Sequence, residues 1–473
     1  LPQKPARDAV TGIVIGSDTP RTGEFACSDP RLNQLQSNIQ WGQRGNYISI
    51  PTDCPQRDER LGWMGDAEVF ARTACFNAGV ASFLTKWLRD VRDAQTKEGA
   101  FTDYSPDVAR DHAGAPAWAD AGVIVPWQVY RCYGDTRLLA DQYEAAKRFV
   151  AYVRDGNPDL LWRKRSGANY GDWLNIQADA PRDVLATAYF ASSVRLVSKM
   201  AAVLGKGEES AAYEQLFRQI REAFLREFVA EDGRIKGDTQ TVYLLALRFD
   251  LLPEDKRPLA AQYLVEDIEK RGTHLSTGFL GVSHLNPVLT DIGRVDLAYR
   301  LLLNDTFPSW GYSIRHGATT IWERWDGWTA EKGFQDPGMN SFNHYSLGSV
   351  GEWMYAVVAG IDLDPEVPGY KKFVLRPRPG GGLTHARGEL LSLYGSILSD
   401  WTIQDGMLHW TIDVPPNTTA TVYVPTGDAS SVTESGRPAA QAEGLKPLPG
   451  EGGAAVFEAG SGRYQLVARA PNP

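Results

Sequence analysis

Hydrophobic residues recur at intervals of three and four along most of the chain, from Asp29 to about residue 360. This spacing is typical of helices that bury one face and leave the other face polar. Asp29 and Pro30 carry the signals of a helix start, so we expect the first helix to begin there. The pattern predicts about twelve helices in all, namely this first one and the segments 65–79, 80–95, 117–133, 136–154, 182–204, 209–228, 238–250, 257–271, 276–287, 291–304 and 341–360.

Three polar segments rich in aromatic residues interrupt the helices, at 97–118, 162–181 and 305–340. Loops as long as the third one are usually functional or disordered when they occur inside a compact domain. Four tryptophans in this loop argue against disorder, and they are Trp310, Trp322, Trp325 and Trp328. We therefore expect the third loop to be ordered and to carry function.

Beyond Ile361 the hydrophobic period changes to two, which is typical of strands. Segments 406–414 and 418–424 alternate on either side of the Pro-Pro-Asn sequence at 415–417, and this arrangement predicts a β-hairpin. Further strands are expected at 453–457 and 464–468. Together these strands predict an all-β domain of the sandwich type.

These patterns divide the chain into three parts. Residues 1–28 contain an alternating segment, 11–17, that reads as a strand and needs a sheet from the C-terminal region or from an upstream domain. The expected fold class is mainly α, with a helical domain at 29–362 and an antiparallel β-sandwich at 363–473. The first residues, Leu-Pro-Gln-Lys, resemble neither a signal peptide nor a natural start, so we expect the chain to be a fragment of a longer protein.

Composition and charge exclude several classes of protein. The 473-residue chain has a net charge of −9 and no basic stripe, so nucleic acid is not an expected partner. No apolar run approaches about 18 residues, so no membrane span is expected. The four cysteines are scattered without metal-binding spacing. We expect them to be reduced and buried, and we favour a cytoplasmic location over a periplasmic or secreted one.

The stretch from Asp53 to Asp66, DCPQRDERLGWMGD, concentrates more reactive side chains than any other part of the chain. It holds four carboxylates, two guanidinium groups and an indole, while Pro55, Gly62 and Gly65 disfavour a helix. This composition predicts a tight loop that turns into a helix near Gly65. Clustered acids and an aromatic residue on such a loop are typical of a binding or catalytic site.

Two acidic residues are candidates for acid–base chemistry, Glu59 in this loop and Glu323 in the segment TTIWERW. Two tryptophans flank Glu323, and such an environment disfavours the charged form of a carboxylate. The alternative is an ordinary ion pair of Glu323 with Arg324 or Arg315. An acid and a base that face one pocket are what glycoside hydrolysis requires.

Other side chains of the loop fit a carbohydrate ligand. Arg57 is suited to hold a carboxylate or a sugar hydroxyl, and Asp53 and Asp66 can accept hydrogen bonds from vicinal hydroxyls. Trp63 would provide a stacking surface, consistent with a chain that contains fourteen Trp and nineteen Tyr, although core packing explains aromatic residues equally well. Asp66 can also cap the helix that begins there.

His344 opens the last predicted helix, and it is either a capping or packing residue or a contact to a sugar. The seven histidines show no HExxH or paired spacing, so no metal is expected. The chain has no GxSxG, phosphate-binding or dinucleotide-binding motif, which excludes serine hydrolases, phosphate-loop enzymes and common dehydrogenases. We expect no cofactor.

At these motifs the chain resembles a known family. The sequences DCPQRDERLGWMGD at 53–66, GATTIWERW at 317–325 and SFNHY at 341–345 are similar to those of the bacterial α-L-rhamnosidases of glycoside hydrolase family 78. The resemblance runs from about residue 10 to the end of the chain. It implies the last strand of an upstream β domain, an (α/α)6 barrel catalytic domain and a C-terminal β-sandwich.

The resemblance also implies roles for individual residues. Glu59 would be the general acid and Glu323 the general base, which activates water, in an inverting hydrolysis of terminal α-L-rhamnose. The substrate contacts that it implies are Asp53, Arg57, Trp63, Asp66, Trp127, Asp172, Trp173, Trp322 and His344. In such a pocket the tryptophans would enclose the C5 methyl group of rhamnose, and the charged side chains would bind its hydroxyls.

Two other interpretations stay open. One is another inverting glycosidase on a helical barrel, similar to a glucoamylase or a trehalase. The other is a rhamnose-binding protein without catalysis, against which the presence of both Glu59 and Glu323 counts. The expected partner is a rhamnose-containing glycoside or oligosaccharide, with no nucleic acid and no membrane, and a homodimer is an option.

Overall fold

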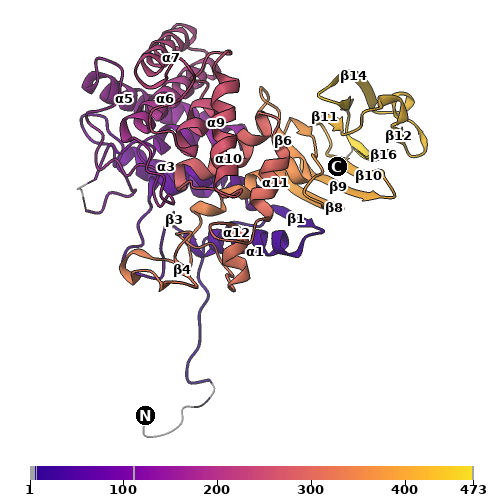
Figure 1. Cartoon of the computed structure of the whole chain (residues 1–473), viewed down its shortest axis with the longest axis horizontal. Coiled ribbons are helices and arrows are strands. Elements are labelled where there is room, and N and C mark those ends of the chain that lie inside the picture. The colour runs from indigo at the N-terminus through magenta and orange to yellow at the C-terminus, as the bar shows by residue number, and fades with distance from the viewer. Residues whose placement is uncertain (1–5, 7, 110–111, 471–473) are drawn as a thin grey trace.

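A computed structural model of the chain describes residues 6, 8–109 and 112–470. A body of helices is followed by a β domain at its side (Figure 1). The first residues, Leu1 to Lys4, whose sequence suggested a fragment, lie outside the described residues. Residues 110–111 of the 97–118 loop and 471–473 of the C-terminal domain also lie outside them.

Five helices and one composite helical segment form the inner ring of a barrel in the described part of the chain. Each contacts the next member of the ring, and the last contacts the first. The inner helices are buried on nearly all sides, as in α2, where every residue is buried. The ring consists of α2 (Met64–Asn77), α4 (Ala121–Tyr133), α6 (Arg182–Val203), α8 (Gln240–Arg248), α10 (Phe279–Asp291) and the composite segment, whose parts are η2 (Ser346–Val350), α13 (Gly351–Trp353) and η3 (Met354–Ala359).

Six further helices cover this ring. Each buries mainly the face that its apolar residues form, as the spacing of three and four residues predicts. They are α1 (Pro30–Asn46), α3 (Ala81–Asp93), α5 (Thr136–Gly156), α7 (Gly207–Phe228), α9 (Arg257–Lys270) and α11 (Val295–Leu303). Alternation of outer and inner helices along the chain makes an (α/α)6 barrel, which confirms the expected fold class.

The start of the first helix follows the sequence signal. The Asp29 carboxylate accepts a hydrogen bond of 2.8 Å from the Arg31 backbone N–H, and Pro30 occupies the first helical position. A proline is tolerated there because that backbone nitrogen has no helical partner. The prediction of a helix start at Asp29 is confirmed.

The last predicted helix is shorter and less regular than 341–360. Helical backbone begins only at Ser346, with a 3-10 turn, one α turn and a π-helical segment. The preceding residues stay extended because His344 pairs with Ile321, to whose carbonyl its N–H donates at 2.8 Å. The prediction of a helix over 341–345 was therefore wrong, since a contact with a distant segment decides the conformation there.

The tryptophan-rich loop 305–340 is ordered, as expected. It also contains short elements that the sequence did not predict, and these are the helix α12 (Trp310–Arg315), the strands β4 (Trp328–Thr329) and β5 (Gly333–Phe334), and the turn η1 (Pro337–Met339). Another small strand pair, β2 (Tyr47–Ile48) and β3 (Ile50–Pro51), precedes the acidic loop.

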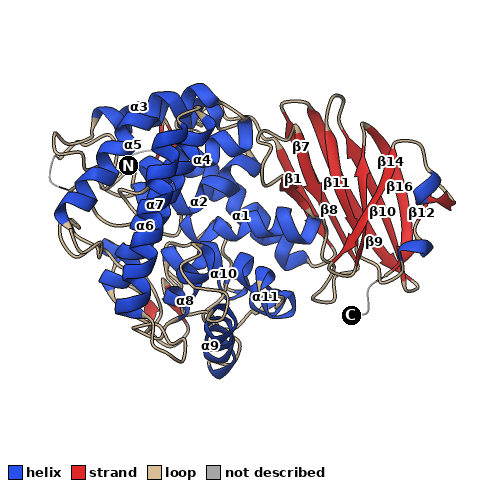
Figure 2. Cartoon of the chain, turned by 90° about the horizontal axis from the view of Figure 1, so that it is seen from above, coloured by secondary structure: helices blue, strands red, loops and turns tan. Residues whose placement is uncertain are grey.

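Two sheets build the β domain beside the barrel (Figure 2). In the order of their pairing, the first sheet has β1 (Gly23–Cys27), β8 (His385–Ser392), β9 (Gly395–Gln404), β10 (Met407–Val414), β16 (Gly462–Arg469), β12 (Thr433–Glu434) and β13 (Arg437–Pro438). The second has β14 (Leu445–Glu451), β15 (Ala454–Ala459), β11 (Thr419–Val424), β7 (Lys372–Leu375) and β6 (Ile361–Leu363), with short turns η4 (Ala429–Ser431) and η5 (Ala439–Gln441) elsewhere in the domain. All pairs are antiparallel except β7 with β11.

The predicted hairpin around 415–417 does not form. β10 pairs with β9 and β16, whereas β11 pairs with β7 and β15 in the other sheet. The Pro-Pro-Asn sequence therefore carries the chain from one sheet to the other. Alternation on both sides of a turn is compatible with either arrangement, because it says which residues are buried but not which strands pair.

The N-terminal strand lies at 23–27 and not at 11–17. β1 pairs with β8 of the C-terminal domain, from Gly23 opposite Leu390 to Cys27 opposite Ala386. None of the described strands pairs with 11–17, and Val14 there is 88% exposed. The prediction of a strand at 11–17 was wrong for the described structure, because its alternating pattern finds no sheet edge.

Two further expectations can be compared with the structure. All four cysteines are buried and free, as predicted from their scattered positions. Within the described ranges no helix combines the length and the apolar character that crossing a membrane requires.

Candidate active site

Most of the predicted site residues gather at one end of the barrel, where the inner helices begin. Asp66 lies in the first turn of α2, and the acidic loop with Glu59 leads into this helix. Glu323 and His344 precede the composite helical segment, and their backbones lie close because Ile321 and His344 form a bridge. The N-termini of helices carry a partial positive charge, which favours carboxylates at this end of the barrel.

The acidic loop is closed by backbone hydrogen bonds. The Asp53 N–H donates to the Leu61 carbonyl at 3.0 Å, and the Met64 N–H donates to the Asp103 carbonyl at 2.9 Å at the start of α2. Gly65 is required at this start, because a Cβ there would lie 2.6 Å from ring atoms of Trp118. The loop and the helix near Gly65 are as the sequence predicts, and the glycine serves the close approach of an indole.

Arg57 joins the two candidate acids. Its Nε donates to the Glu59 Oε2 at 2.9 Å, and its Nη1 lies 3.7 Å from the Glu323 Oε2. The cation beside Glu323 is therefore Arg57, whereas Arg324 pairs with Asp326 at 2.9 Å. One guanidinium thus brings together two carboxylates that are far apart in the sequence.

Glu59 is held by three neighbours. The Trp63 Nε1 donates to its Oε1 at 2.8 Å, in addition to the bonds from Arg57. Burial raises the pKa of Glu59, but hydrogen bonds from Asp53, Arg57 and Trp63 outweigh burial and hold this pKa below its ordinary value. The indole of Trp63 therefore positions the acid as well as offering a ring face.

Asp53 is buried beside Glu59. Burial, with the nearby charges of Asp66 and Glu59, raises the pKa of Asp53 to about 7. Two carboxyl groups that share a buried site do not both ionise readily, so Asp53 and Glu59 titrate as a pair. With a pKa of about 7, the pair holds its last proton below neutral pH and loses it as the pH rises through this value.

Glu323 is more deeply buried, with 3% of its surface exposed. Burial raises its pKa above the ordinary value, while the nearby His344 and Arg57 partly offset the effect. The Cys54 sulfur lies 4.0 Å from its Oε2. The directions of the two pKa shifts therefore differ between Glu59 and Glu323, which is typical of paired acids with separate roles.

Asp66 and His344 form a buried contact. The His344 Nε2 lies 3.0 Å from the Asp66 Oδ1, and the Ser346 hydroxyl donates to the same carboxylate at 2.8 Å. The His344 Nδ1 accepts from the Ser346 N–H at 3.2 Å, so the ring carries its proton on Nε2. Asp66 makes no cap bond to its own helix.

Aromatic rings surround Trp63. Its ring meets Tyr104 and Tyr170 edge-on at 5.2 and 5.6 Å, and Tyr170 in turn packs on Trp118 at 4.7 Å and on Trp173 at 6.0 Å. Trp63 and Trp173 had been predicted as site residues, whereas Tyr104, Trp118 and Tyr170 had not. All three lie in the aromatic loops 97–118 and 162–181, so the aromatic content of these loops was the signal that could have identified them.

The Asp172 carboxylate accepts hydrogen bonds from backbone N–H groups at the start of α10. Its Oδ1 accepts from the N–H groups of Leu280 and Gly281 at 2.8 and 3.1 Å, and its Oδ2 accepts from the Gly278 N–H at 2.8 Å and from the Thr241 hydroxyl. The carboxylate thus caps the start of α10 from another segment and has no acceptor directed at a ligand. These bonds indicate a structural role for Asp172, and its contact with the substrate stays a prediction.

Trp127 does not join the other site residues. It lies six residues into α4, and its ring faces a cavity between the later turns of the inner helices. Six helical residues correspond to about 9 Å along the axis, which separates Trp127 from the end where the acids lie. This position gives no support to Trp127 as a sugar contact, which stays a prediction.

Trp322, the neighbour of Glu323 in the sequence, packs edge-on against Phe342 at 4.9 Å. It lines a hollow of about 310 Å³ together with Trp328 and Phe334. The structure therefore places Trp322 beside the site, in a second aromatic group.

One group among the described residues has the composition of a metal site. The ligand atoms of Asp53, Cys54 and His344 lie within 4.8 Å of one another. Both His344 nitrogens are already engaged by Asp66 and Ser346. Burial also raises the pKa of the Cys54 thiol far above its ordinary value, so the thiolate that metals prefer is disfavoured. The residues present thus fit a metal poorly.

Fold and site together define the class of protein. A helical barrel that presents a half-buried and a buried carboxylate with a group of indoles at the N-termini of its inner helices is the arrangement of a six-hairpin glycosidase domain. The family model described as bacterial α-L-rhamnosidase 6 hairpin glycosidase domain matches residues 20–358, and the model of the corresponding C-terminal domain matches residues 360–438. The chain belongs to the bacterial α-L-rhamnosidase family.

Known relatives agree with this assignment. An α-L-rhamnosidase of Streptomyces avermitilis is 50% identical over 467 residues, which are 99% of this chain and 44% of the relative. One of Formosa agariphila is 41% identical over 474 residues, covering 98% of this chain and 50% of the relative. This chain spans about half the length of the curated relatives that it matches.

Solved structures share the fold. The crystal structure of the Streptomyces avermitilis α-L-rhamnosidase complexed with L-rhamnose matches with a TM-score of 0.93 at 49% identity, over 98% of this chain and 44% of that chain. The α-L-rhamnosidase from Dictyoglumus thermophilum matches with a TM-score of 0.90 at 35% identity, over 99% of this chain and 52% of that chain.

Proposed function

We propose that this chain carries the catalytic site of an inverting α-L-rhamnosidase, with Glu59 as general acid and Glu323 as general base. The observation that carries the proposal is the contact of both carboxylates with Arg57, at 2.9 and 3.7 Å. Family membership supplies the substrate class, terminal non-reducing α-L-rhamnose in a glycoside or oligosaccharide.

The proposed reaction has one displacement step. Glu59 donates a proton to the glycosidic oxygen as the bond from this oxygen to C1 of rhamnose breaks. Glu323 takes a proton from a water molecule whose oxygen bonds to C1 from the opposite face. Inversion requires room for this water, and carboxyl groups about 6.5–9.5 Å apart provide it.

The pKa shifts of the acids support these roles. The proton held by the Asp53–Glu59 pair is available to the leaving group below neutral pH. When the glycosidic oxygen replaces solvent beside Glu59, this oxygen becomes an acceptor and the proton passes through Glu59 to it. Glu323 must be ionised to act as a base, so the reaction requires a pH above its raised pKa.

The remaining side chains fit the sugar. Asp66 and His344 present a fixed polar pair that can bind hydroxyls. Trp63 and Trp173, with Tyr170 between them, offer an apolar surface for the C5 methyl group, the part of rhamnose that distinguishes it from glucose. The relative from Streptomyces avermitilis was crystallised with L-rhamnose, which supports the choice of sugar.

The first test is hydrolysis of p-nitrophenyl α-L-rhamnoside by this chain, with p-nitrophenyl α-D-glucoside and β-D-glucoside alongside. We expect release from the rhamnoside only, with the β anomer of rhamnose as the first product in proton NMR. First release of the α anomer would refute inversion. Turnover of glucosides would favour a glucoamylase-like or trehalase-like enzyme, and rhamnose binding without turnover would indicate a binding protein.

The second test separates the acid from the base. We expect Glu59→Gln and Glu323→Gln each to lower kcat by about 10²–10⁴-fold. The loss in Glu59→Gln should be larger on an alkyl rhamnoside than on p-nitrophenyl rhamnoside, because a poor leaving group depends more on protonation. The loss in Glu323→Gln should be similar on both. Glu331→Gln, at an exposed position of the same loop as Glu323, is the control and should keep its turnover.

A further inference from the structure

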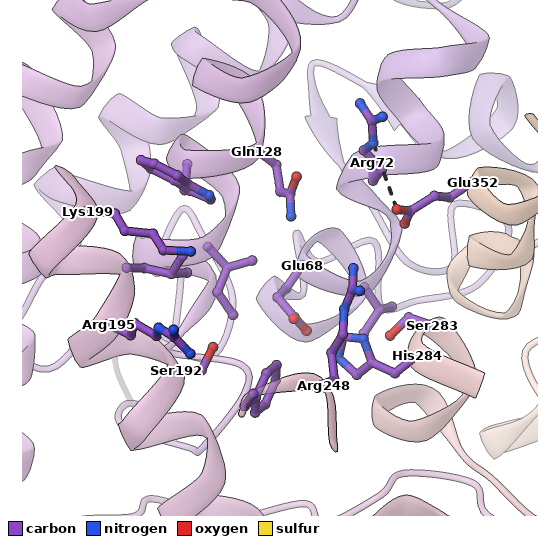
Figure 3. Close-up of a pocket in the computed structure, with 15 residues that line it drawn as sticks. Glu68, Arg72, Gln128, Ser192, Arg195, Lys199, Arg248, Ser283, His284 and Glu352 are labelled. Carbon is purple, nitrogen blue, oxygen red and sulfur yellow. Dashed lines mark ion pairs between the residues drawn. The ribbon is translucent and has the colours of Figure 1, made fainter. Parts of the chain in front are cut away.

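A second cavity lies between the inner helices, farther along them than the candidate active site (Figure 3). Its volume is about 280 Å³, and residues from α2, α4, α6, α10 and α13 and from the end of α8 line it. Along α2, Glu68 and Arg72 face this cavity, whereas Asp66 faces the candidate active site. The cavity is thus separate from the catalytic end.

Four basic and two acidic side chains line the cavity, and one of the acids, Glu352, lies 3.8 Å from Arg72. Three arginines of the cavity are each paired with an acid, in the contacts Arg72–Asp362 at 2.7 Å, Arg195–Asp250 at 3.0 Å and Arg248–Asp291 at 3.4 Å. Lys199 lines the same cavity and forms no ion pair with any residue of the described ranges. Burial and the nearby charge of Arg195 lower the pKa of Lys199. The cavity therefore holds one cation without a counter-ion.

The acid nearest the centre does not neutralise this charge. Glu68 points into the middle of the cavity in Figure 3, is 7% exposed, and its Oε2 has no hydrogen-bond partner among the described residues. Burial, reinforced by the charge of Asp120, raises the pKa of Glu68 well above its ordinary value. Burial thus favours the neutral form of Glu68, which can donate a hydrogen bond to a ligand.

Two more polar groups in the lining have no partner. The Ser283 hydroxyl and the His284 Nε2 are both buried without a hydrogen bond in the described structure. Burial and the charge of Arg248 lower the pKa of His284 to about 3, so its ring is neutral. Buried polar atoms are nearly always paired, and unpaired ones that face one cavity indicate a missing ligand or water.

The remaining wall is apolar. The Trp127 ring lies 6.0 Å from the Lys199 Nζ, and Ile124, Leu196 and Phe249 extend the apolar surface. An unpaired cation beside an indole and several free donors fit a ligand with acceptor oxygens and an apolar body. Trp127 thus lies in the wall of this cavity beside Lys199, an environment that the sequence did not predict.

We propose that this cavity binds a small organic oxyanion, a carboxylate or a phosphate monoester, whose charge pairs with Lys199 and whose apolar part packs against Trp127. The competing explanation is that the cations only balance the partial negative charge at the C-terminal ends of the inner helices. In that case no anion would bind in preference to chloride. The proposal does not depend on the reaction assigned to the candidate active site.

The test measures where an anion binds. Acetylation of lysines by an N-hydroxysuccinimide ester is followed residue by residue by mass spectrometry, with phenyl phosphate, benzoate, inorganic phosphate or chloride at equal ionic strength. We expect phenyl phosphate or benzoate to slow acetylation of Lys199 at least about fivefold without protecting the exposed Lys86. Equal protection by chloride, or no protection by any anion, would overturn the proposal.

Calorimetry with two variants tests the parts of the site. Lys199→Met should weaken binding of the protecting anion about tenfold, the loss expected for one charged hydrogen bond, and Lys86→Met should not. Trp127→Ala should remove the preference for phenyl phosphate over inorganic phosphate. Unchanged affinity in Lys199→Met would overturn the proposal, and circular dichroism checks that each variant is folded. If a variant does not fold, protection of Lys199 from acetylation in the chain without substitutions still tests whether the cavity binds an anion. Binding of phenyl phosphate but not of benzoate would identify a phosphate site. Binding of benzoate but not of phenyl phosphate would identify a carboxylate site.

Discussion

Replacement of Asp172 by alanine should destabilise the barrel more than it changes substrate binding. The carboxylate accepts three backbone N–H groups, from Gly278, Leu280 and Gly281, and the Thr241 hydroxyl. All four donors are buried. The substitution therefore removes the cap of α10 and leaves its first turn unsatisfied.

The expected magnitude follows from these four bonds. Loss of a helix cap costs about 0.5–2 kcal/mol, and a buried donor left without a partner costs about 1–3 kcal/mol. Water that enters the space of the removed carboxylate satisfies some of these donors. We expect the free energy of unfolding to fall by about 3–5 kcal/mol, at the upper end of single substitutions.

Urea unfolding followed by circular dichroism measures this change, and Asp179→Ala is the matched control. Asp179 lies in the same loop, is exposed, and accepts one hydrogen bond from Asn175 at 2.9 Å. Its removal should cost no more than about 0.5 kcal/mol. A stable Asp172→Ala variant with a raised KM for rhamnosides would refute the reasoning and support Asp172 as a substrate contact.

Two further predictions concern the site. In a pH profile, kcat/KM for rhamnosides should rise as Glu323 loses its proton above its ordinary pKa, and it should fall above about pH 7 as the Asp53–Glu59 pair loses its proton. An activity that stays constant to pH 9 would contradict the shared proton. In steady-state kinetics, Trp63→Phe should lower kcat/KM about tenfold or more, because Glu59 loses a hydrogen bond. Trp127→Phe should change it less than twofold, and a large effect of Trp127→Phe would contradict its place away from the acids.

Much of the helical fold could be predicted because amphipathic spacing is a local property. The segment 136–154 shows this spacing clearly, and α5 runs from Thr136 to Gly156. Predictions failed where pairing with a distant segment decides the structure. Residues 341–345 stay extended against Ile321, and the strands on either side of 415–417 enter different sheets. Their own sequences cannot show these partners.

The candidate site also has parts that the sequence predicts and parts that depend on contacts between distant segments. The motifs identified Glu59 and Glu323, but their contact through Arg57 depends on how the loops fold onto one another. Among the aromatic residues, the sequence favoured Trp127, whereas Trp118 lies in the ring cluster around Tyr170. Trp118 precedes α4 and Trp127 lies in its middle, so their positions along the barrel axis decide which of them lies near the acids.

The pairing of β1 with β8 also sets an order of events during synthesis. β1 leaves the ribosome before the barrel, and β8 follows only after the barrel is complete, since translation proceeds from the N-terminus. Until then β1 has no partner, and an unpaired strand invites pairing with other chains. The five residues of β1 thus join the start of the chain to the β domain. This sheet is complete only when β1 pairs with β8, which is synthesised several hundred residues later.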